Sequence, residues 1–150
     1  MKHLKQTKRS NCGQTCMAML ADKTIEEVET ALGKRGCTSG TDFRKLLPKL
    51  RPSICLQERM ILMSKELLDK IIEGGGYSIA LILMIRPKEK SKKGHWVVLS
   101  GKHVYDPAFD NKVSARWYLK RLSKQNRRVT SYMVVEDFIL MEQGGYEMVN

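Results

Sequence analysis

Four polar side chains of this 150-residue chain have the types that nucleophilic acyl transfer requires. Cys12 offers a thiol, His95 an imidazole that can take the thiol proton, and Asp106 a carboxylate that can orient the imidazole. Gln6, six residues before the cysteine, offers an amide that can hold a developing oxyanion together with the backbone N–H of Cys12. These residue types predict attack of a thiolate on a carbonyl carbon.

Cys12 lies where a polar loop turns into a helix that is predicted to run from Cys12 to Ala21. Asn11 is the expected N-cap, with Gln14 reaching back as in a capping box. At the first position of a helix, free N–H groups and the helix dipole favour a thiolate over a thiol. Gly13 leaves room for a substrate backbone to approach, so it is predicted to line the substrate site.

Each of these residues also has an ordinary structural explanation when it is taken alone. A free cysteine is often a small buried hydrophobe on a core helix. A histidine at a strand end, such as His95, is often only structural, and Asp106-Pro107 is a common turn sequence. Cys16, one helical turn after Cys12, is expected to face the core as a packing residue.

The chain is strongly basic, with a net charge of +11 and a pI near 9.6. Its basic residues gather in three segments, at 1–9, 86–93 and 116–128. Such a balance implies attraction to an anionic partner, which includes acidic peptides, nucleic acids and membrane surfaces. A single basic cluster is also typical of a solvated face, so the three clusters alone do not choose among these partners.

The sequence predicts a soluble, cytoplasmic protein with no membrane partner. Its longest apolar run, at 79–85, is too short to cross a bilayer, and its N-terminus is charged and has no signal-peptide core. In that compartment we expect reduced thiols and no disulfide at the four cysteines, which are Cys12, Cys16, Cys37 and Cys55. Their spacing does not predict zinc, so neither a metal nor a cofactor is expected.

The order of the expected elements, helices first and antiparallel strands second, indicates a single α+β domain over residues 1–150. Helices are expected at 12–21, from a capping box at Thr24 to Gly33, from a cap at Thr41 and Asp42 to Pro48, from Ser64 to the glycines at 74–76, and at 114–125. The last of them is expected to pack through Trp117, Leu119 and Leu122. The final residues, from 144 onward, are expected to form a loose tail.

Strands are expected at 56–62, 77–85, 95–99, 103–106, 129–135 and 138–141. The second is apolar throughout, which is typical of a central strand buried on both faces. The third and fourth form an antiparallel meander around the turn at Gly101. In that meander His95 opens one strand and Asp106 ends the next, where a carboxylate can accept a hydrogen bond from the imidazole.

Several motifs together resemble a known family. They are Gln6 followed by Cys12-Gly13, the small residue Cys16 in the next turn, the turn Thr38-Ser39-Gly40-Thr41, the strand Gly94-His95-Trp96-Val97-Val98-Leu99, and Val104-Tyr105-Asp106-Pro107-Ala108. Their order and spacing, over about residues 4–110, are similar to those of the papain-like cysteine peptidases of the C39 type. That family is best known as the domain that trims double-glycine leader peptides in bacteriocin exporters.

The resemblance implies a papain-like fold, with N-terminal helices packed on a C-terminal antiparallel sheet. It implies that Cys12 is the nucleophile, His95 the general base and then acid, Asp106 its orienter and Gln6 the oxyanion donor. Gly94 and Trp96, with Gly13, are then expected at the substrate site. The implied reaction is hydrolysis of a peptide, isopeptide or other amide bond through a thioester.

Two differences from the family limit what the resemblance implies. The exporters carry this domain ahead of a membrane span and an ATPase, which these 150 residues lack, so export-coupled leader processing is not implied. The basic charge is the other difference. On a papain-like fold the three basic segments would border the cleft, which indicates a protein or peptide substrate of acidic character.

Two alternatives from other classes stay open. A nucleic-acid-directed protein, such as a ribonuclease toxin, can be built on the same scaffold, because a fold does not fix a function. Aromatic residues make up only 7% of the chain, and no stacking array is interleaved with its basic residues, which disfavours this alternative. An inactive binding module is the other. Within the enzyme class, a deamidase is an alternative to a peptidase.

Overall fold

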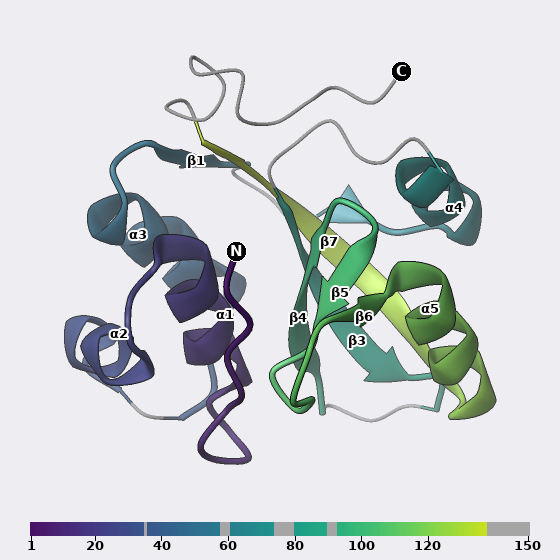
Figure 1. Cartoon of the computed structure of the whole chain (residues 1–150), viewed down its shortest axis with the longest axis horizontal. Helices are drawn as coiled ribbons and strands as arrows, with labels where there is room; N and C mark the ends of the chain where they lie inside the picture. Colours follow the sequence, from purple (N-terminus) through teal and green to yellow (C-terminus); the bar gives the residue numbers. More distant parts are fainter. Residues whose placement is uncertain (35, 58–60, 74–79, 90–92, 138–150) are drawn as a thin grey trace.

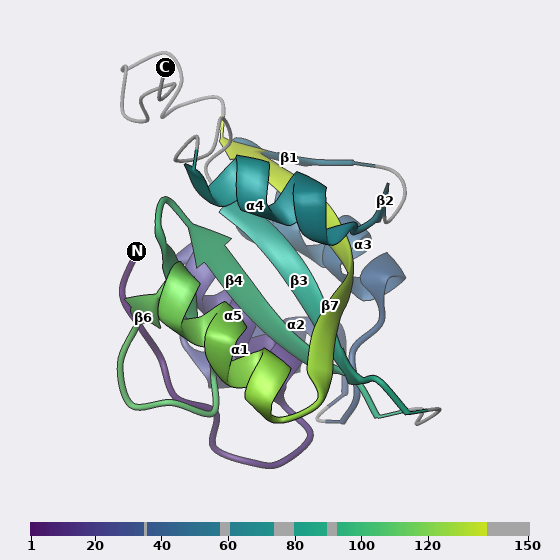
Figure 2. The same ribbon diagram turned by 90° about the vertical axis from the view of Figure 1, so that its right-hand side faces the viewer.

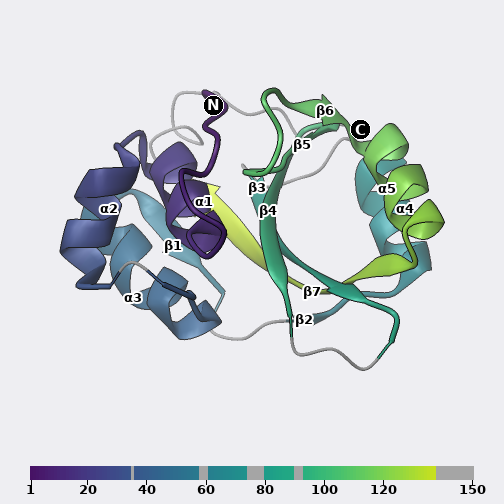
Figure 3. The same ribbon diagram turned by 90° about the horizontal axis from the view of Figure 1, so that it is seen from below.

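The computed structural model describes residues 1–34, 36–57, 61–73, 80–89 and 93–137, and within them helices cover both faces of one antiparallel sheet (Figure 1). One face carries α1 (Cys12–Ala21), α2 (Ile25–Leu32) and α3 (Gly40–Leu50). The other carries α4 (Lys65–Glu73) and α5 (Ala115–Lys124), as the views in Figures 2 and 3 show. The predicted α+β class, with helices packed on an antiparallel sheet, is confirmed.

The sheet has the strand order β1-β7-β3-β4-β5-β6, and β2 also pairs with β7. The strands are β1 (Ile54–Leu56), β2 (Ile61–Leu62), β3 (Ala80–Pro87), β4 (His95–Ser100), β5 (His103–Tyr105), β6 (Val113–Ser114) and β7 (Arg127–Asp137). As predicted, β3 is central and β4 and β5 form an antiparallel meander. The meander turns at Gly101, whose φ of +61° is one that glycine adopts without strain.

Successive side chains of the central strands point to opposite faces of the sheet, so the interior is divided into two apolar cores, one on each face. On β3, Ile82 and Met84 pack with α1 and α3, whereas Leu81 and Leu83 pack with α4 and α5. The uninterrupted apolar run of this strand follows from burial on both faces. The sheet is therefore the middle layer, and any site at its edge can draw residues from both helical layers.

Helix α1 begins and ends where the sequence predicts, but its N-terminus is not capped as expected. Asn11 occupies the N-cap position, yet its side chain makes no cap hydrogen bond and instead accepts from the backbone N–H of Lys8. Gln14 is buried and donates to the carbonyl of Gly36, so it does not complete a capping box. The first N–H groups of α1 are therefore not taken up by either side chain.

The neighbouring helices follow the sequence with one correction. Helix α2 has the predicted capping box at Thr24 and ends at Gly33. Helix α3 begins at Gly40 rather than after Thr41, because Ser39 and Asp42 form the capping box. It also continues through Pro48 to Leu50, where an end had been expected at the proline.

Two predicted strands differ from the observed ones. The strand expected at 56–62 is two short strands, β1 and β2, which pair with different parts of β7. The strand expected at 129–135 is the longer β7, which reaches Asp137. The glycines at 74–76, the strand expected at 138–141 and the expected tail lie outside the described residues.

Helix α5 packs partly as predicted. Leu122 is buried and Leu119 packs against the same core, as expected, but Trp117 is 48% exposed. The other buried residues of the helix are Ala115 and Tyr118. The observed stripe follows the i, i+3, i+7 spacing of a helix that has one face on a sheet. The consequence for the site is that Tyr118, not Trp117, points toward the sheet.

Candidate active site

The Cys12 thiol lies at the N-terminus of α1, in contact with His95 from the start of β4. Backbone N–H groups of Trp96 and Gly13 also interact with the sulfur. Burial raises the pKa of the Cys12 thiol, but the hydrogen bond from His95, the two backbone contacts and the charge of His95 together lower the pKa below its ordinary value of 9.0. These contacts therefore make the thiolate of Cys12 easier to form than that of an ordinary cysteine.

His95 is held from its other side by Asp106, which follows β5. His95 Nε2 lies 2.6 Å from Asp106 Oδ1. Because Nε2 is engaged by the carboxylate, Nδ1 is the nitrogen available to the Cys12 sulfur. Burial lowers the pKa of the imidazole, but Asp106 and Cys12 outweigh that effect and raise the pKa to about 9. His95 therefore holds its second proton at neutral pH.

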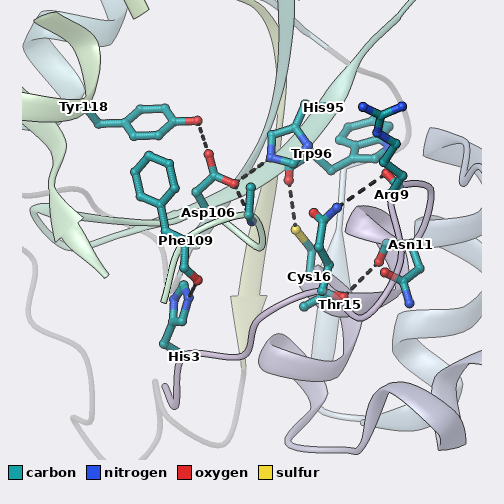
Figure 4. A network of polar contacts seen from close by, with 12 residues as sticks. His3, Arg9, Asn11, Thr15, Cys16, His95, Trp96, Asp106, Phe109 and Tyr118 are labelled. Carbon is teal, nitrogen blue, oxygen red and sulfur yellow. Dashed lines mark hydrogen bonds and ion pairs between the residues drawn. The ribbon is translucent and has the colours of Figure 1, made fainter. Parts of the chain in front are cut away.

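The Asp106 carboxylate accepts three hydrogen bonds, which fix its orientation (Figure 4). Besides His95, the backbone N–H of Ala108 donates to Oδ1 at 2.8 Å, and the Tyr118 hydroxyl donates to Oδ2 at 2.6 Å. Burial raises the pKa of Asp106, but His95, Tyr118 and Ala108 outweigh it, so the pKa is below its ordinary value. The carboxylate stays ionised opposite the imidazolium.

Tyr118 is a site residue that sequence reasoning missed. It is 1% exposed and comes from α5, and among the described residues its hydroxyl is the only side-chain donor to Asp106 Oδ2. Burial and the neighbouring Asp106 raise the pKa of Tyr118, so its proton stays in place. The available signal was the 115, 118, 122 spacing on α5, which makes Tyr118 the one polar tip on the buried stripe.

The expectation that Cys16 faces the core is confirmed. Its side chain is fully buried and its sulfur donates to the backbone carbonyl of Trp96 at 3.4 Å (Figure 4). Burial, with the nearby charges of Cys12 and Asp106, raises the pKa of Cys16 well above its ordinary value. The pKa values of the two cysteines of α1 are therefore shifted in opposite directions, down at Cys12 and up at Cys16.

Gln6 is near the site, but its amide does not face the N-terminus of α1 in this structure. Its Nε2 donates to the carbonyls of Lys8 at 2.9 Å and Arg9 at 3.4 Å. Its backbone N–H donates to the carbonyl of Pro107 at 2.7 Å, and its side chain lines a pocket together with His95 and Asp106. A turn of the side chain is needed before the amide can donate to an oxyanion.

Backbone groups at the start of α1 are better placed for that task. The N–H of Cys12 opens the helix, where no intrahelical acceptor exists, and the Asn11 side chain does not cap it. A helix N-terminus of this kind stabilises negative charge. The uncapped start of α1 thus provides a donor for an oxyanion that forms beside the Cys12 sulfur.

Two of the residues expected to bind substrate pack against the turn at Thr38, and their expected role stays a prediction. Gly13 is buried, and a Cβ at this position would lie 2.6 Å from Thr38 Oγ1, so the glycine leaves room for that turn. Trp96 is 6% exposed, and its indole N–H donates to the carbonyl of Thr38 at 2.9 Å. Gly94 is exposed beside His95, so its expected role stays a prediction.

The N-terminal segment ties the two halves of the site together. His3 Nε2 and the carbonyl of Phe109 are 2.7 Å apart, and Lys5 forms an ion pair with Asp110 at 2.8 Å. With the bond from Gln6 to Pro107, these contacts fasten residues 3–6 to the loop that carries Asp106. The segment leads directly into α1, so it connects the Cys12 side of the site to the Asp106 side.

The described residues contain no group of three or more side chains suited to hold a metal ion, and their four cysteines are free. None of the described helices has the length and apolar character that crossing a membrane requires. A scan against protein-family models and a search of curated proteins gave no match to the chain. The case for an activity therefore rests on the contacts among Cys12, His95, Asp106 and Tyr118.

Proposed function

We propose that this protein is a papain-like cysteine peptidase, a thiol hydrolase that cleaves an amide bond through a thioester on Cys12. The observation that carries the proposal is the continuous chain of contacts from Cys12 through His95 to Asp106 and Tyr118. Nucleophilic acyl transfer requires a nucleophile, a base that contacts it and an acid that orients the base. The resemblance to the double-glycine leader peptidases, which rests on the same residues, points the same way.

In the first step the Cys12 thiolate attacks the substrate carbonyl carbon, and a carbon–sulfur bond forms while the carbonyl electron pair moves to oxygen. The N–H of Cys12, at the open start of α1, stabilises that oxyanion, with Gln6 as the second donor after its side chain turns. The carbon–nitrogen bond then breaks, and the His95 imidazolium gives its proton to the leaving amine. The product is a thioester on Cys12.

In the second step water attacks the thioester, and the neutral His95 takes a proton from that water. The carbon–sulfur bond breaks, the acid leaves, and the thiolate–imidazolium pair is restored. Asp106 keeps its charge throughout and stabilises the imidazolium in the resting enzyme. Because a thiolate of this kind is lost to oxidation outside a reducing compartment, we place the protein in the cytoplasm.

Wild type, Cys12→Ser and the matched control Cys16→Ala test the proposal on a mixed peptide library, with cleavage followed by mass spectrometry. We expect wild type and Cys16→Ala to cleave a common subset of peptides, and Cys12→Ser to lose roughly 1,000-fold or more of that rate. Cleavage by Cys12→Ser at the wild-type rate contradicts the proposal.

The second candidate function is cleavage of RNA, which the net charge of +11 favours. The same three proteins are incubated with total RNA at two salt concentrations. RNA cleavage that depends on Cys12 and weakens steeply with salt, without any peptide cleavage, replaces the peptidase proposal with a ribonuclease.

A further inference from the structure

A pocket of about 270 Å³ opens on the His95 side of the site. Its lining includes Gln6, His95, Asp106 and Tyr118, together with Phe109, Arg121 and Arg127. Cys12 is not among its lining residues, although it contacts His95. The pocket is therefore displaced from the nucleophile toward the imidazole and α5.

The position of the pocket relative to the proton donor identifies the part of a substrate that it would receive. In acyl transfer the imidazolium gives its proton to the leaving amine, so the leaving segment must lie against the imidazole. The acyl segment instead stays bonded to the sulfur of Cys12. The pocket contacts His95 and not Cys12, which is the arrangement that a site for the leaving segment requires.

Two guanidinium groups line this pocket, and neither forms an ion pair with a carboxylate of the described residues. Within the described part of the chain, two aromatic rings, and not a carboxylate, contact the Arg121 side chain. Its guanidinium lies 5.4 Å from the centre of the Phe109 ring and 5.5 Å from the centre of the Trp117 ring. Stacking against two rings limits the directions in which the side chain can turn. The charge of Arg121 is thus held at the pocket by aromatic surface.

The nearby carboxylates are already engaged elsewhere. Both oxygens of Asp106 accept hydrogen bonds, from His95 and Ala108 on one side and from Tyr118 on the other. Asp110 is paired with Lys5. Arg127 lies close enough to Tyr118 for its charge to act on the phenol, so both guanidiniums are near the reacting histidine.

We propose that this pocket binds an aspartate or glutamate side chain of the substrate, located within the first residues after the scissile bond. The inference rests on the proposed function. Guanidinium forks match a carboxylate in geometry as well as charge, and a pocket of this size fits one side chain rather than a folded surface. The carboxylate would be bound between Arg121 and Arg127, beside the leaving amine.

The test compares three peptides that differ only at the first residue after the scissile bond, which is glutamate, glutamine or lysine. Their common frame is taken from a peptide that the wild-type protein cleaves. We expect wild type to cleave the glutamate peptide with a kcat/KM roughly 10-fold or more above that of the glutamine peptide. Arg121→Gln and Arg127→Gln should each reduce that ratio toward one, and Arg127→Glu should favour the lysine peptide.

Lys124→Gln is the matched control, because it removes one positive charge from α5 at a residue that does not line the pocket. It should leave the glutamate-to-glutamine ratio within about twofold, since a distant exposed charge is screened by salt. An equal fall of the ratio in Lys124→Gln and Arg127→Gln overturns the inference in favour of a diffuse effect of net charge. A wild-type ratio of one overturns it as well.

A binding measurement separates this inference from the proposed function. Fluorescein-labelled penta-glutamate and penta-glutamine peptides are titrated into Cys12→Ser protein, alone and combined with Arg127→Gln or Lys124→Gln, and followed by anisotropy. Tighter binding of penta-glutamate that Arg127→Gln alone weakens supports the carboxylate pocket, even if no peptide is cleaved and the peptidase proposal fails. Equal binding of the two peptides overturns the pocket, even if Cys12-dependent cleavage is found.

Discussion

At the scale of single residues, the site depends on where one proton lies between Cys12 and His95. The pKa of Cys12 is below its ordinary value of 9.0, and the pKa of His95 is raised to about 9. These opposite shifts favour a thiolate at Cys12 beside an imidazolium at His95. His95 is the side chain that lowers the pKa of Cys12, whereas Asp106 contributes more than Cys12 to the raised pKa of His95.

The first prediction concerns the pH dependence of alkylation. Iodoacetamide should begin to react with Cys12 at a lower pH than with a free thiol, because the pKa of Cys12 is lowered. His95→Asn removes the imidazolium, so the rise in rate should move to higher pH. Mass spectrometry of the labelled protein measures the rate at each cysteine. An unchanged profile in His95→Asn, or labelling of Cys16 before Cys12, contradicts the assignment.

The same pair predicts a second limit for turnover. Because the pKa of His95 is about 9, the imidazolium is lost as pH rises through that value, and the leaving amine then has no proton donor. The pH profile of kcat/KM for a cleaved peptide should therefore be bell-shaped, with its alkaline limb near 9. A rate that keeps rising above that pH is inconsistent with His95 as the acid.

Tyr118 tests the other end of the chain of contacts. Tyr118→Phe leaves the buried Oδ2 of Asp106 without its donor, so we expect the free energy of unfolding to fall by about 1–3 kcal/mol. Without this hydrogen bond Asp106 holds His95 less firmly, so the substitution should also lower kcat more than it changes KM. Tyr105→Phe is the control. Tyr105 precedes Asp106 in the sequence, but its ring packs in the other core, so this change removes a hydroxyl away from Oδ2. Equal effects of the two changes would remove Tyr118 from the site.

At the scale of elements, the turn at Thr38 locks together the start of α1 and the start of β4. Gly13 of α1 lies against the Thr38 side chain, and the Trp96 indole of β4 donates to the Thr38 carbonyl. The same turn leads through Ser39 into α3. These contacts set the distance between the helix that carries the thiol and the strand that carries the imidazole.

Gly13→Ala should therefore destabilise the protein, although alanine is the better helix former by about 1 kcal/mol. Overpacking against Thr38 should lower the free energy of unfolding by about 1–3 kcal/mol, as measured by urea denaturation. Thr38→Gly should relieve much of that cost in the double variant. Gly36→Ala serves as the control, because a Cβ there meets no atom within 4 Å and should be nearly neutral.

The elements that the sequence predicted correctly are those specified by neighbouring residues. The capping box at Thr24, the length of α1 and the meander around Gly101 all follow from local patterns. Two of the failures involve residues whose partners are distant in sequence. Gln14 pairs with Gly36, and Tyr118 pairs with Asp106, so tertiary contacts override the local motif.

At the scale of the whole molecule, two helical layers cover opposite faces of one sheet, and the site combines residues from both layers with residues of the sheet. Cys12 comes from the α1 side, whereas Tyr118 comes from the α5 side (Figure 3). The order of helices and strands predicted the α+β class, but not the cover that α4 and α5 give to the second face. Tyr118 could not be assigned to the site without knowing that cover.

The net charge of +11 acts on the molecule as a whole. For the glutamate peptide described above, kcat/KM should fall by roughly 10-fold between low and high salt, because screening weakens the attraction of an acidic substrate. The glutamine peptide should be far less sensitive. Turnover rates of the two peptides across a salt series measure the difference, and parallel curves contradict an electrostatic preference.

The central claim is that the Cys12–His95 pair makes a nucleophile for acyl transfer, and p-nitrophenyl acetate tests it without knowledge of the natural substrate. Rapid mixing near neutral pH, followed by digestion and mass spectrometry, locates any acetyl group. The predicted result is a burst of nitrophenol with the acetyl group on Cys12, lost in Cys12→Ser and strongly slowed in His95→Asn. An acetyl group found only on the exposed Cys37 or Cys55 of folded protein would contradict the claim.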